Sequence, residues 1–317
     1  MSEQNLDIFN SPQKLYEALN NNGYICDKDI PLIIYLAYKL NKAILLQGEP
    51  GCGKTEVAKK MSKLLNNNDP IRLQCYDSLS KEDALYSWDY QKQLLYIEAN
   101  KEKQNWQELE DDLYSDKFIS PRALYKSIIS DKTEVLLIDE IDKADEDFES
   151  FLLEFLAEQQ ISLSESKTIK AKNKPLVFIT SNDKRDLSDA LKRRCLYLYI
   201  KYPIIEKTIK IVTSHVPNIN DLLLTQIVTL VDKIRNDKLK KKPSISETID
   251  WAKTLVTLNI DKLNPNIIKQ TMNVLLKEES DIQLETRKLN QYYKELPNES
   301  IIKVNNINEI NDNEWDF

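Results

Sequence analysis

The sequence predicts an α/β fold in which helices cover both faces of a parallel sheet, followed by an all-helical region. Short apolar segments alternate with helical patterns up to about residue 200, and only helical periodicity follows, from about 204 to 295. Strands buried on both faces read as continuous apolar runs. The candidate strands are 43–47, 71–75, 135–138, 176–180 and 196–200. The expected domains are 1–203 for the α/β region with N-terminal helices, 204–296 for the helical region and 297–317 for an acidic, Asn-rich tail.

The segment Gly48–Thr55 matches the phosphate-binding P-loop pattern G-x-x-x-x-G-K-[ST]. It holds three of the chain's four glycines and lies between an apolar strand pattern and an amphipathic helix pattern. Glycine lets successive N–H groups turn toward an anion, and the helix N-terminus adds its positive dipole. We expect Lys54 to contact the β- and γ-phosphates and Thr55 to hold Mg²⁺ through its hydroxyl. The expected nucleotide-binding residues are Glu49, Pro50, Gly51, Cys52, Gly53, Lys54, Thr55 and Glu56.

The apolar strand 135–138 ends in two carboxylates, Asp139 and Glu140. In a chain with a P-loop, this is the Walker B pattern. We expect Asp139 to bind Mg²⁺ through water and Glu140 to polarise the water that attacks the γ-phosphate. A solvated strand end is the other interpretation, and the P-loop disfavours it.

Polar residues also follow the last two predicted strands. Asn182 lies just after the strand 176–180, where a polar side chain can touch the γ-phosphate or its water. A short helix then carries Arg193 and Arg194 into the final strand. These arginines are either a solvated helix end or a finger that reaches the nucleotide of a neighbouring subunit, with Arg194 the first choice.

Composition excludes several function classes. The net charge is −7 and the pI is about 5.1, which argues against a dedicated nucleic-acid binder. The longest apolar run, 30–40, is too short to span a membrane, and the N-terminus lacks a signal-peptide pattern. The single histidine, His215, removes His-based catalysis and zinc sites. A reduced, cytoplasmic protein is expected, because its cysteines are scattered: Cys26, Cys52, Cys75 and Cys195.

Three further segments have simple structural interpretations. We interpret the aromatic-rich stretch after residue 76 as a packed insertion rather than a ligand site, and the basic run 238–243 as a solvated loop. Ser120 and Pro121 suit a helix N-cap and first turn. The aromatic residues are Tyr76, Tyr86, Trp88, Tyr90, Tyr96 and Trp106.

This order of motifs resembles the AAA+ ATPases. The details are similar to the MoxR family, and most similar to its CoxD-type branch, through roughly residues 30–255. The matching stretches are 48–55, 72–76, 84–90, 136–145, 151–154, 180–183, 190–196 and 243–251. The resemblance implies an αβα core with sheet order 5-1-4-3-2, a helical lid and a homo-oligomeric ring, a hexamer. It also implies an insertion in the second core helix near 76–106 and a hairpin insertion near 161–174.

The resemblance further implies a chaperone-like ATPase that remodels a client protein. Members of the family typically work with a partner that has a von Willebrand factor A domain, and the CoxD-type branch is associated with maturation of carbon monoxide dehydrogenase. A nucleotide-gated scaffold with little turnover and a nucleic-acid motor remain as alternatives. Many AAA+ lids carry a sensor-2 arginine, but the matching stretch 243–247 has none. Ser120-Pro121-Arg122 looks like that motif but precedes Walker B, so we interpret it as a decoy.

Overall fold

The computed structural model describes residues 7–100, 109, 112–113, 115–164 and 167–297, in two compact units. The first unit contains the chain up to Asn22, Cys26–Gly48 and Lys54–Tyr199. The second contains Gly23–Ile25, Glu49–Gly53 and the chain from Ile200 onward. Trp106 and nearly all of the expected tail, 298–317, lie outside the described residues.

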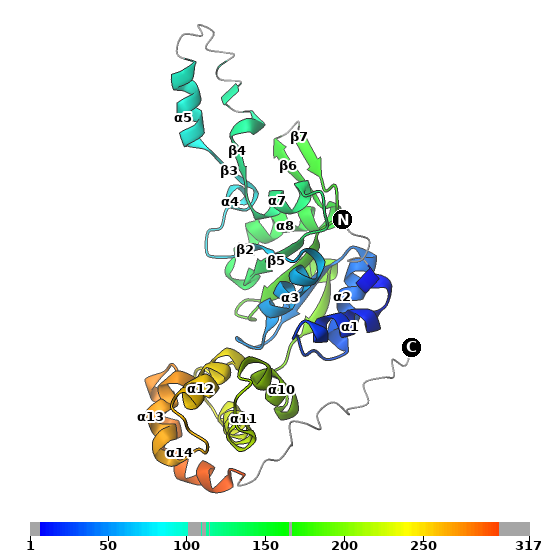
Figure 1. Cartoon of the computed structure of the whole chain (residues 1–317). Coiled ribbons are helices and arrows are strands. Elements are labelled where there is room, and N and C mark those ends of the chain that lie inside the picture. The colour runs from blue at the N-terminus through cyan, green and yellow to red at the C-terminus, as the bar shows by residue number, and fades with distance from the viewer. Residues whose placement is uncertain (1–6, 101–108, 110–111, 114, 165–166, 298–317) are drawn as a thin grey trace. The chain divides into compact units, whose positions relative to one another are not determined.

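A five-stranded parallel sheet forms the centre of the first unit (Figure 1). Its strand order is β2-β5-β8-β1-β9, and each neighbouring pair is parallel. If these five strands are numbered along the chain, the order from the β9 edge is 5-1-4-3-2, so the predicted fold class is confirmed. The strands are β1 (Ala43–Gln47), β2 (Ile71–Gln74), β5 (Val135–Asp139), β8 (Leu176–Ser181) and β9 (Cys195–Tyr199).

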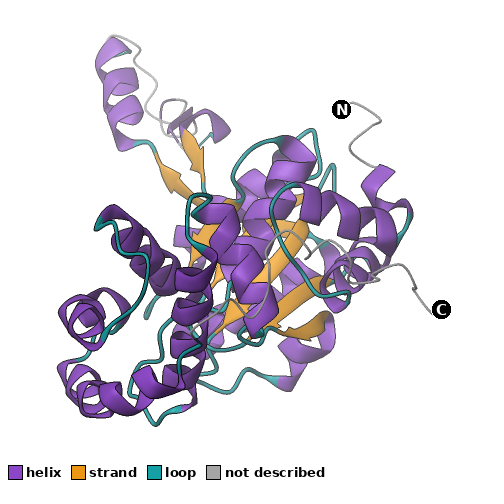
Figure 2. Cartoon of the chain, turned by 60° about the horizontal axis from the view of Figure 1, so that its bottom comes forward, coloured by secondary structure: helices purple, strands orange, loops and turns teal. Residues whose placement is uncertain are grey.

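Both faces of the sheet are covered. Successive side chains of a strand point to opposite faces, yet Val135, Leu136, Leu137 and Ile138 are all fully buried. Leu136 and Ile138 belong to a core cluster that includes residues of two neighbouring helices. Figure 2 shows the orange strands of this unit lying among helices. The unit's helices are η2 (Asp7–Asn10), α1 (Pro12–Asn21), α2 (Asp29–Leu40), α3 (Lys54–Asn66), α4 (Lys81–Leu85), α7 (Ala123–Ile129), η4 (Ile141–Lys143), α8 (Glu146–Glu158) and α9 (Asp189–Arg194).

A hairpin extends from the first unit between α4 and α7. Its strands β3 (Tyr86–Trp88) and β4 (Ile119–Pro121) pair antiparallel, and between them lie α5 (Tyr90–Ala99) and η3 (Asp116–Phe118). The two strands of this hairpin begin at residue 86 and end at 121, so the hairpin is later in the chain than the insertion expected near 76–106. A second antiparallel hairpin, β6 (Gln160–Ser164) and β7 (Lys167–Lys170), begins one residue before the stretch 161–174 in which the resemblance implied one and ends inside it.

The expected role of Ser120 and Pro121 as a helix N-cap and first turn is wrong. Ser120 pairs with Ser87 across the hairpin, and α7 begins at Ala123 with Arg122 as its N-cap. The hairpin's cross-strand pairing decides the conformation here. Pro121 is tolerated because it ends a short strand that has a single neighbour.

The second unit is built from helices around its own apolar core. At that core the indole Nε1 of the fully buried Trp251 donates a 2.8 Å hydrogen bond to Thr271 Oγ1. The basic run 238–243 is a loop, as predicted, and its backbone N–H groups at Lys240 and Lys241 donate to the buried carboxylate of Asp281. The helices are α10 (Ile205–His215), α11 (Asp221–Asn236), α12 (Ile245–Thr257), α13 (Pro265–Leu275) and α14 (Glu279–Glu295). None of the helices in the described part of the chain has the length and apolarity to cross a membrane.

Candidate functional site

The P-loop leads from β1 into α3. Gly51 and Gly53 have φ of +77° and +101°, a region that residues with a Cβ rarely adopt, which explains why glycine is needed at both positions. Lys54 is the first residue of α3 and is buried, and its Nζ donates a 2.7 Å hydrogen bond to the carbonyl oxygen of Gly48. The lysine is therefore folded back along its own loop.

Asp139 ends β5 and is only 4% exposed. Its Oδ1 accepts hydrogen bonds from the hydroxyls of Thr55, at 3.2 Å, and Thr180, at 2.6 Å. The residue after the P-loop lysine and the Walker B aspartate are thus in direct contact. Hydroxyl and carboxylate oxygens are the ligands that Mg²⁺ prefers, so this donor set fits that cation.

Glu140 has an unusual backbone conformation, with φ 58° and ψ 52°. Its N–H donates a 2.8 Å hydrogen bond to Thr180 Oγ1. Its Oε1 accepts from Asn182 Nδ2 at 3.1 Å, while Oε2 accepts from Gln74 Nε2 at 2.9 Å and from Lys143 Nζ at 2.6 Å. Glu140 and Asn182, which the sequence placed on different strands, are therefore brought together.

Two residues of β2 contact this carboxylate pair, and the sequence analysis gave neither a role. Arg72 donates to Asp139 Oδ2 through Nε at 3.0 Å and Nη2 at 2.5 Å, and Nη2 also contacts Gln74 Oε1. Gln74 lies beside Asp139 in the β2–β5 register and donates to Glu140. A spacing of two residues puts both side chains on one face of the strand, but the sequence alone does not show that this face meets Asp139.

Asp142 is a further residue that the sequence analysis left without a role. It is buried in η4, and its carboxylate accepts 3.2 Å hydrogen bonds from the backbone N–H groups of Asn182 and Lys184. Asp142 thereby fixes the loop after β8 against the end of β5, and this holds Asn182 next to Glu140.

The thiol of Cys75 lies beside this group of acids and has a raised pKa. Burial, and then the nearby charges of Asp139, Asp142 and Glu140, raises the pKa of Cys75 to about 12. All four cysteines are buried. Cys75 is consequently a neutral thiol at ordinary pH, which removes it as a nucleophile.

Arg193 and Arg194 lie at the end of α9 and are exposed, as predicted for a helix end or a finger. Arg194 Nη1 donates to its own helix at Ala190 O, 3.2 Å away. The start of α9 is fixed by the buried Glu149 of α8, whose Oε1 accepts from Ser188 N at 2.8 Å. The arginines thus lie on a helix whose N-terminus is anchored, and their side chains face solvent in the single chain.

The P-loop segment Glu49–Gly53 belongs to the second unit, where it contacts two of that unit's segments. Pro50 O accepts a 2.8 Å hydrogen bond from the Tyr202 hydroxyl, and Gly51 O accepts from Ile245 N at 3.3 Å. A Cβ on Gly51 would lie 2.1 Å from Ser244 Cβ, so only glycine fits there.

The second unit has no arginine in 243–247, as the sequence showed, but it does bury one on α11. Arg235 Nε donates to Pro243 O at 2.8 Å, and its guanidinium lies 4.7 Å from the ring centroid of Tyr202. Burial lowers the pKa of Arg235 and raises the pKa of Tyr202 to about 12. Tyr202 therefore remains a neutral hydrogen-bond donor at ordinary pH.

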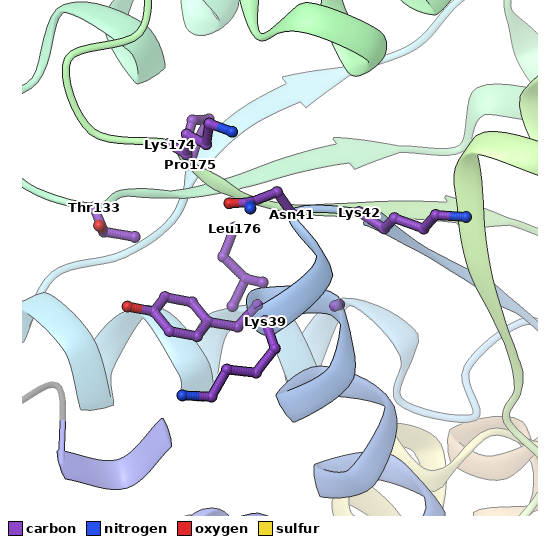
Figure 3. Close-up of a pocket in the computed structure, with 9 residues that line it drawn as sticks. Lys39, Asn41, Lys42, Thr133, Lys174, Pro175 and Leu176 are labelled. Atoms are coloured by element: carbon purple, nitrogen blue, oxygen red, sulfur yellow. The ribbon is translucent and has the colours of Figure 1, made fainter. Parts of the chain in front are cut away.

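A cavity of about 330 Å³ lies at the opposite end of the same strands, where β1, β5 and β8 begin. Three lysines line it, Lys39, Lys42 and Lys174, together with Asn41 and Thr133. In Figure 3 the three ammonium groups point in different directions and do not share one anion position. The cavity lies apart from the P-loop site, and its three lysines do not converge on one point as a phosphate-binding site requires.

Sheet order, P-loop and the carboxylate pair on β5 together define a P-loop domain of the AAA+ class. Residues 43–195 match the family model described as an AAA domain of the dynein-related subfamily. This match covers the strands from β1 to the first residue of β9, and with the helical second unit it identifies an α/β P-loop AAA+ fold. The family match does not reach the finer MoxR or CoxD-type level.

Two solved structures are similar to this chain. A candidate ATPase from Cytophaga hutchinsonii is 16% identical, with a TM-score of 0.46, over 93% of this chain and 97% of that one. A point mutant of RuvB from Thermotoga maritima is 18% identical, with a TM-score of 0.45, over 85% of this chain and 72% of that one. No curated protein matches the chain. The assignment of the fold accordingly rests on the family model and the sheet topology.

Proposed function

We propose that this chain is an ATPase that hydrolyses Mg²⁺-ATP and uses the energy to remodel a partner protein. The observation that carries the proposal is the contact set at the end of β5. Asp139 contacts the P-loop threonine, and Glu140 contacts the strand-tip amide of Asn182. An AAA domain match over the same residues supports it.

The nucleotide-binding role goes to the P-loop residues 49–56, with Lys54 as the cation that meets the phosphates. Thr55 and Asp139 would hold Mg²⁺, because their oxygens already lie within hydrogen-bonding distance of each other. When bound, the cation would neutralise charge that develops on the phosphoryl oxygens. The preference for ATP follows from the family alone.

The hydrolytic role goes to Glu140 as the residue that orients and polarises the attacking water. Both of its carboxylate oxygens accept hydrogen bonds in this structure, from Gln74, Lys143 and Asn182. A carboxylate has about four acceptor positions, so these three contacts leave room for a water that donates to Oε1. Asn182 would keep the carboxylate oriented toward that water.

The proposal extends to a homo-oligomeric ring, a hexamer, in which Arg194 or Arg193 completes the site of the next subunit. The exposure of both arginines at the end of α9 supports a role outside their own chain. The resemblance to the MoxR family, and to its CoxD-type branch, suggests a partner with a von Willebrand factor A domain and a metalloenzyme client such as carbon monoxide dehydrogenase.

Glu140→Gln tests the proposal. The amide keeps the shape and the contact with Asn182 but loses the charge, so we expect ATP binding to persist and turnover to fall by at least about 100-fold. ATP affinity by calorimetry and phosphate release by a coupled assay measure the two effects separately. Near-normal turnover would show that Glu140 only ends the strand.

Two other results would point to the alternatives. Wild-type protein that binds ATP tightly, assembles with a partner and releases almost no phosphate would be a nucleotide-gated scaffold. Binding to DNA that weakens steeply as salt rises would favour a nucleic-acid motor. Pull-down with the Glu140→Gln variant, which should remain ATP-bound, would identify the partner.

A further inference from the structure

The shortest ion pair at the site joins Asp139 to Arg72, a residue with no role in the proposed hydrolysis. Arg72 makes two hydrogen bonds to Asp139 Oδ2, at 3.0 and 2.5 Å. The hydroxyls of Thr55 and Thr180 donate to the other oxygen of Asp139, Oδ1. The carboxylate proposed to hold Mg²⁺ thus already has a cation on one side.

This cation is a guanidinium, whose planar array of N–H donors matches the geometry of a carboxylate. Hydrogen bonds from an ionised donor to an ionised acceptor are stronger than neutral ones. A divalent ion that binds Asp139 must therefore displace Arg72 from the carboxylate or bind beside its positive charge.

Arg72 is placed so that it can move. Its strand, β2, is at the edge of the sheet, and its side chain is 52% exposed while that of Asp139 is 5% exposed. The aspartate is fixed by two threonine hydroxyls, and the arginine reaches it from the solvent side. The flexible partner of this ion pair is thus Arg72.

We propose that Arg72 occupies Asp139 in the cation-free site and competes there with the divalent cation that accompanies the nucleotide. Arg72 would thus set the cation affinity of the site without touching the phosphates. This inference rests on the proposed Mg²⁺-nucleotide site. It concerns the binding of the cation, and not the rate of hydrolysis.

The test measures Mn²⁺ binding to the protein–ADP complex, because bound Mn²⁺ is followed directly by electron paramagnetic resonance. Removing a competing charge should tighten binding, so Arg72→Gln should lower the Mn²⁺ dissociation constant about tenfold, or ~1.4 kcal/mol. Arg122→Gln is the matched control. Arg122 is also an exposed arginine of the first unit, and its Nε contacts Ser87 in the hairpin. It should leave Mn²⁺ affinity unchanged.

A double-mutant cycle tests whether the effect passes through Asp139. In an Asp139→Asn background, Arg72→Gln should change Mn²⁺ affinity by less than about twofold, because the competing pair no longer exists. If Arg72→Gln proves unstable, Arg72→Lys keeps the charge, loses the two-point contact and should give a smaller gain than tenfold. A gain of the same size in the Asp139→Asn background would overturn the inference.

Unchanged or weaker Mn²⁺ binding in Arg72→Gln or Arg72→Lys would also overturn it, provided that the variant melts like wild type and binds metal-free ADP equally well. Arg72 would then only orient Asp139. Failure of the wild-type protein to bind ADP, with or without Mn²⁺, would instead refute the proposed nucleotide site itself. The two failures are therefore distinguishable.

Discussion

Thr180 makes the most sharply testable contact in the site, because one buried hydroxyl serves both carboxylate residues. Its Oγ1 donates to Asp139 Oδ1 at 2.6 Å and accepts from Glu140 N at 2.8 Å. Thr180 is 1% exposed and lies in the central strand β8. Thr180→Val removes both hydrogen bonds, with almost no change in shape and no loss of β propensity.

The magnitude follows from the two groups that lose a partner. A hydrogen bond to a charged group contributes about 1.5–3 kcal/mol, and an orphaned buried N–H costs about 1–3 kcal/mol. Asp139 keeps its contacts with Thr55 and Arg72, so we take the low value of each range and expect a loss of about 2.5 kcal/mol. That free energy corresponds to a roughly 100-fold change in an opening equilibrium.

Hydrogen–deuterium exchange of peptides that span β5 and β8 measures this loss in the first unit alone, which avoids assuming one cooperative transition for two units. Protection should fall by about 100-fold in Thr180→Val, and by less than tenfold in Thr180→Ser, which keeps the hydroxyl. Thr254→Val, at a half-buried site on α12 in the second unit, should leave β5 and β8 unchanged. A decrease in protection of less than fivefold in Thr180→Val would refute the reasoning, since water would then satisfy the Asp139 carboxylate and the Glu140 N–H.

The remaining predictions concern phosphate binding, the finger and pH. Lys54→Ala should weaken nucleotide affinity on the order of 100-fold, because it removes a charged donor aimed along the P-loop; an unchanged dissociation constant in calorimetry would contradict the P-loop assignment. Arg194→Ala should leave ATP binding nearly intact and cut hydrolysis by about 10³-fold. Mixing it with Glu140→Gln subunits should restore activity in some sites, and absence of rescue with either Arg194 or Arg193 variants would rule out a trans-acting finger. The free energy of unfolding should fall as pH rises from 9 toward 12, because the pKa of Cys75 is raised from 9.0 to about 12 on folding, so the unfolded thiol loses its proton first. Cys75→Ala should make that decline shallower in urea titrations at pH 8 and 10, and an identical pH dependence would show that this thiol does not contribute.

Local patterns predicted the parts of the fold that depend on local chemistry. The P-loop glycines, the apolar strands and the paired acids at 139 and 140 each follow from a backbone or burial requirement that acts within a few residues. The sheet order came from the resemblance, and the structure confirmed it.

The sequence did not show contacts that depend on register between distant strands. Arg72 meets Asp139, and Gln74 meets Glu140, because β2 and β5 are neighbours with Gln74 beside Asp139. Nothing near residue 72 indicates that pairing. Ser120 was misassigned for the same reason, since its partner Ser87 is 33 positions away and belongs to a hairpin whose turn region carries a helix.

The left-handed backbone at Glu140 has a cost in stability. Only glycine adopts φ near 58° without steric cost, and for other residues that cost is about 1 kcal/mol or more. Glycine at 140 would therefore relieve the backbone while removing the carboxylate. If Glu140 activates water as proposed, glutamate at this position lowers the stability of the fold and makes turnover possible.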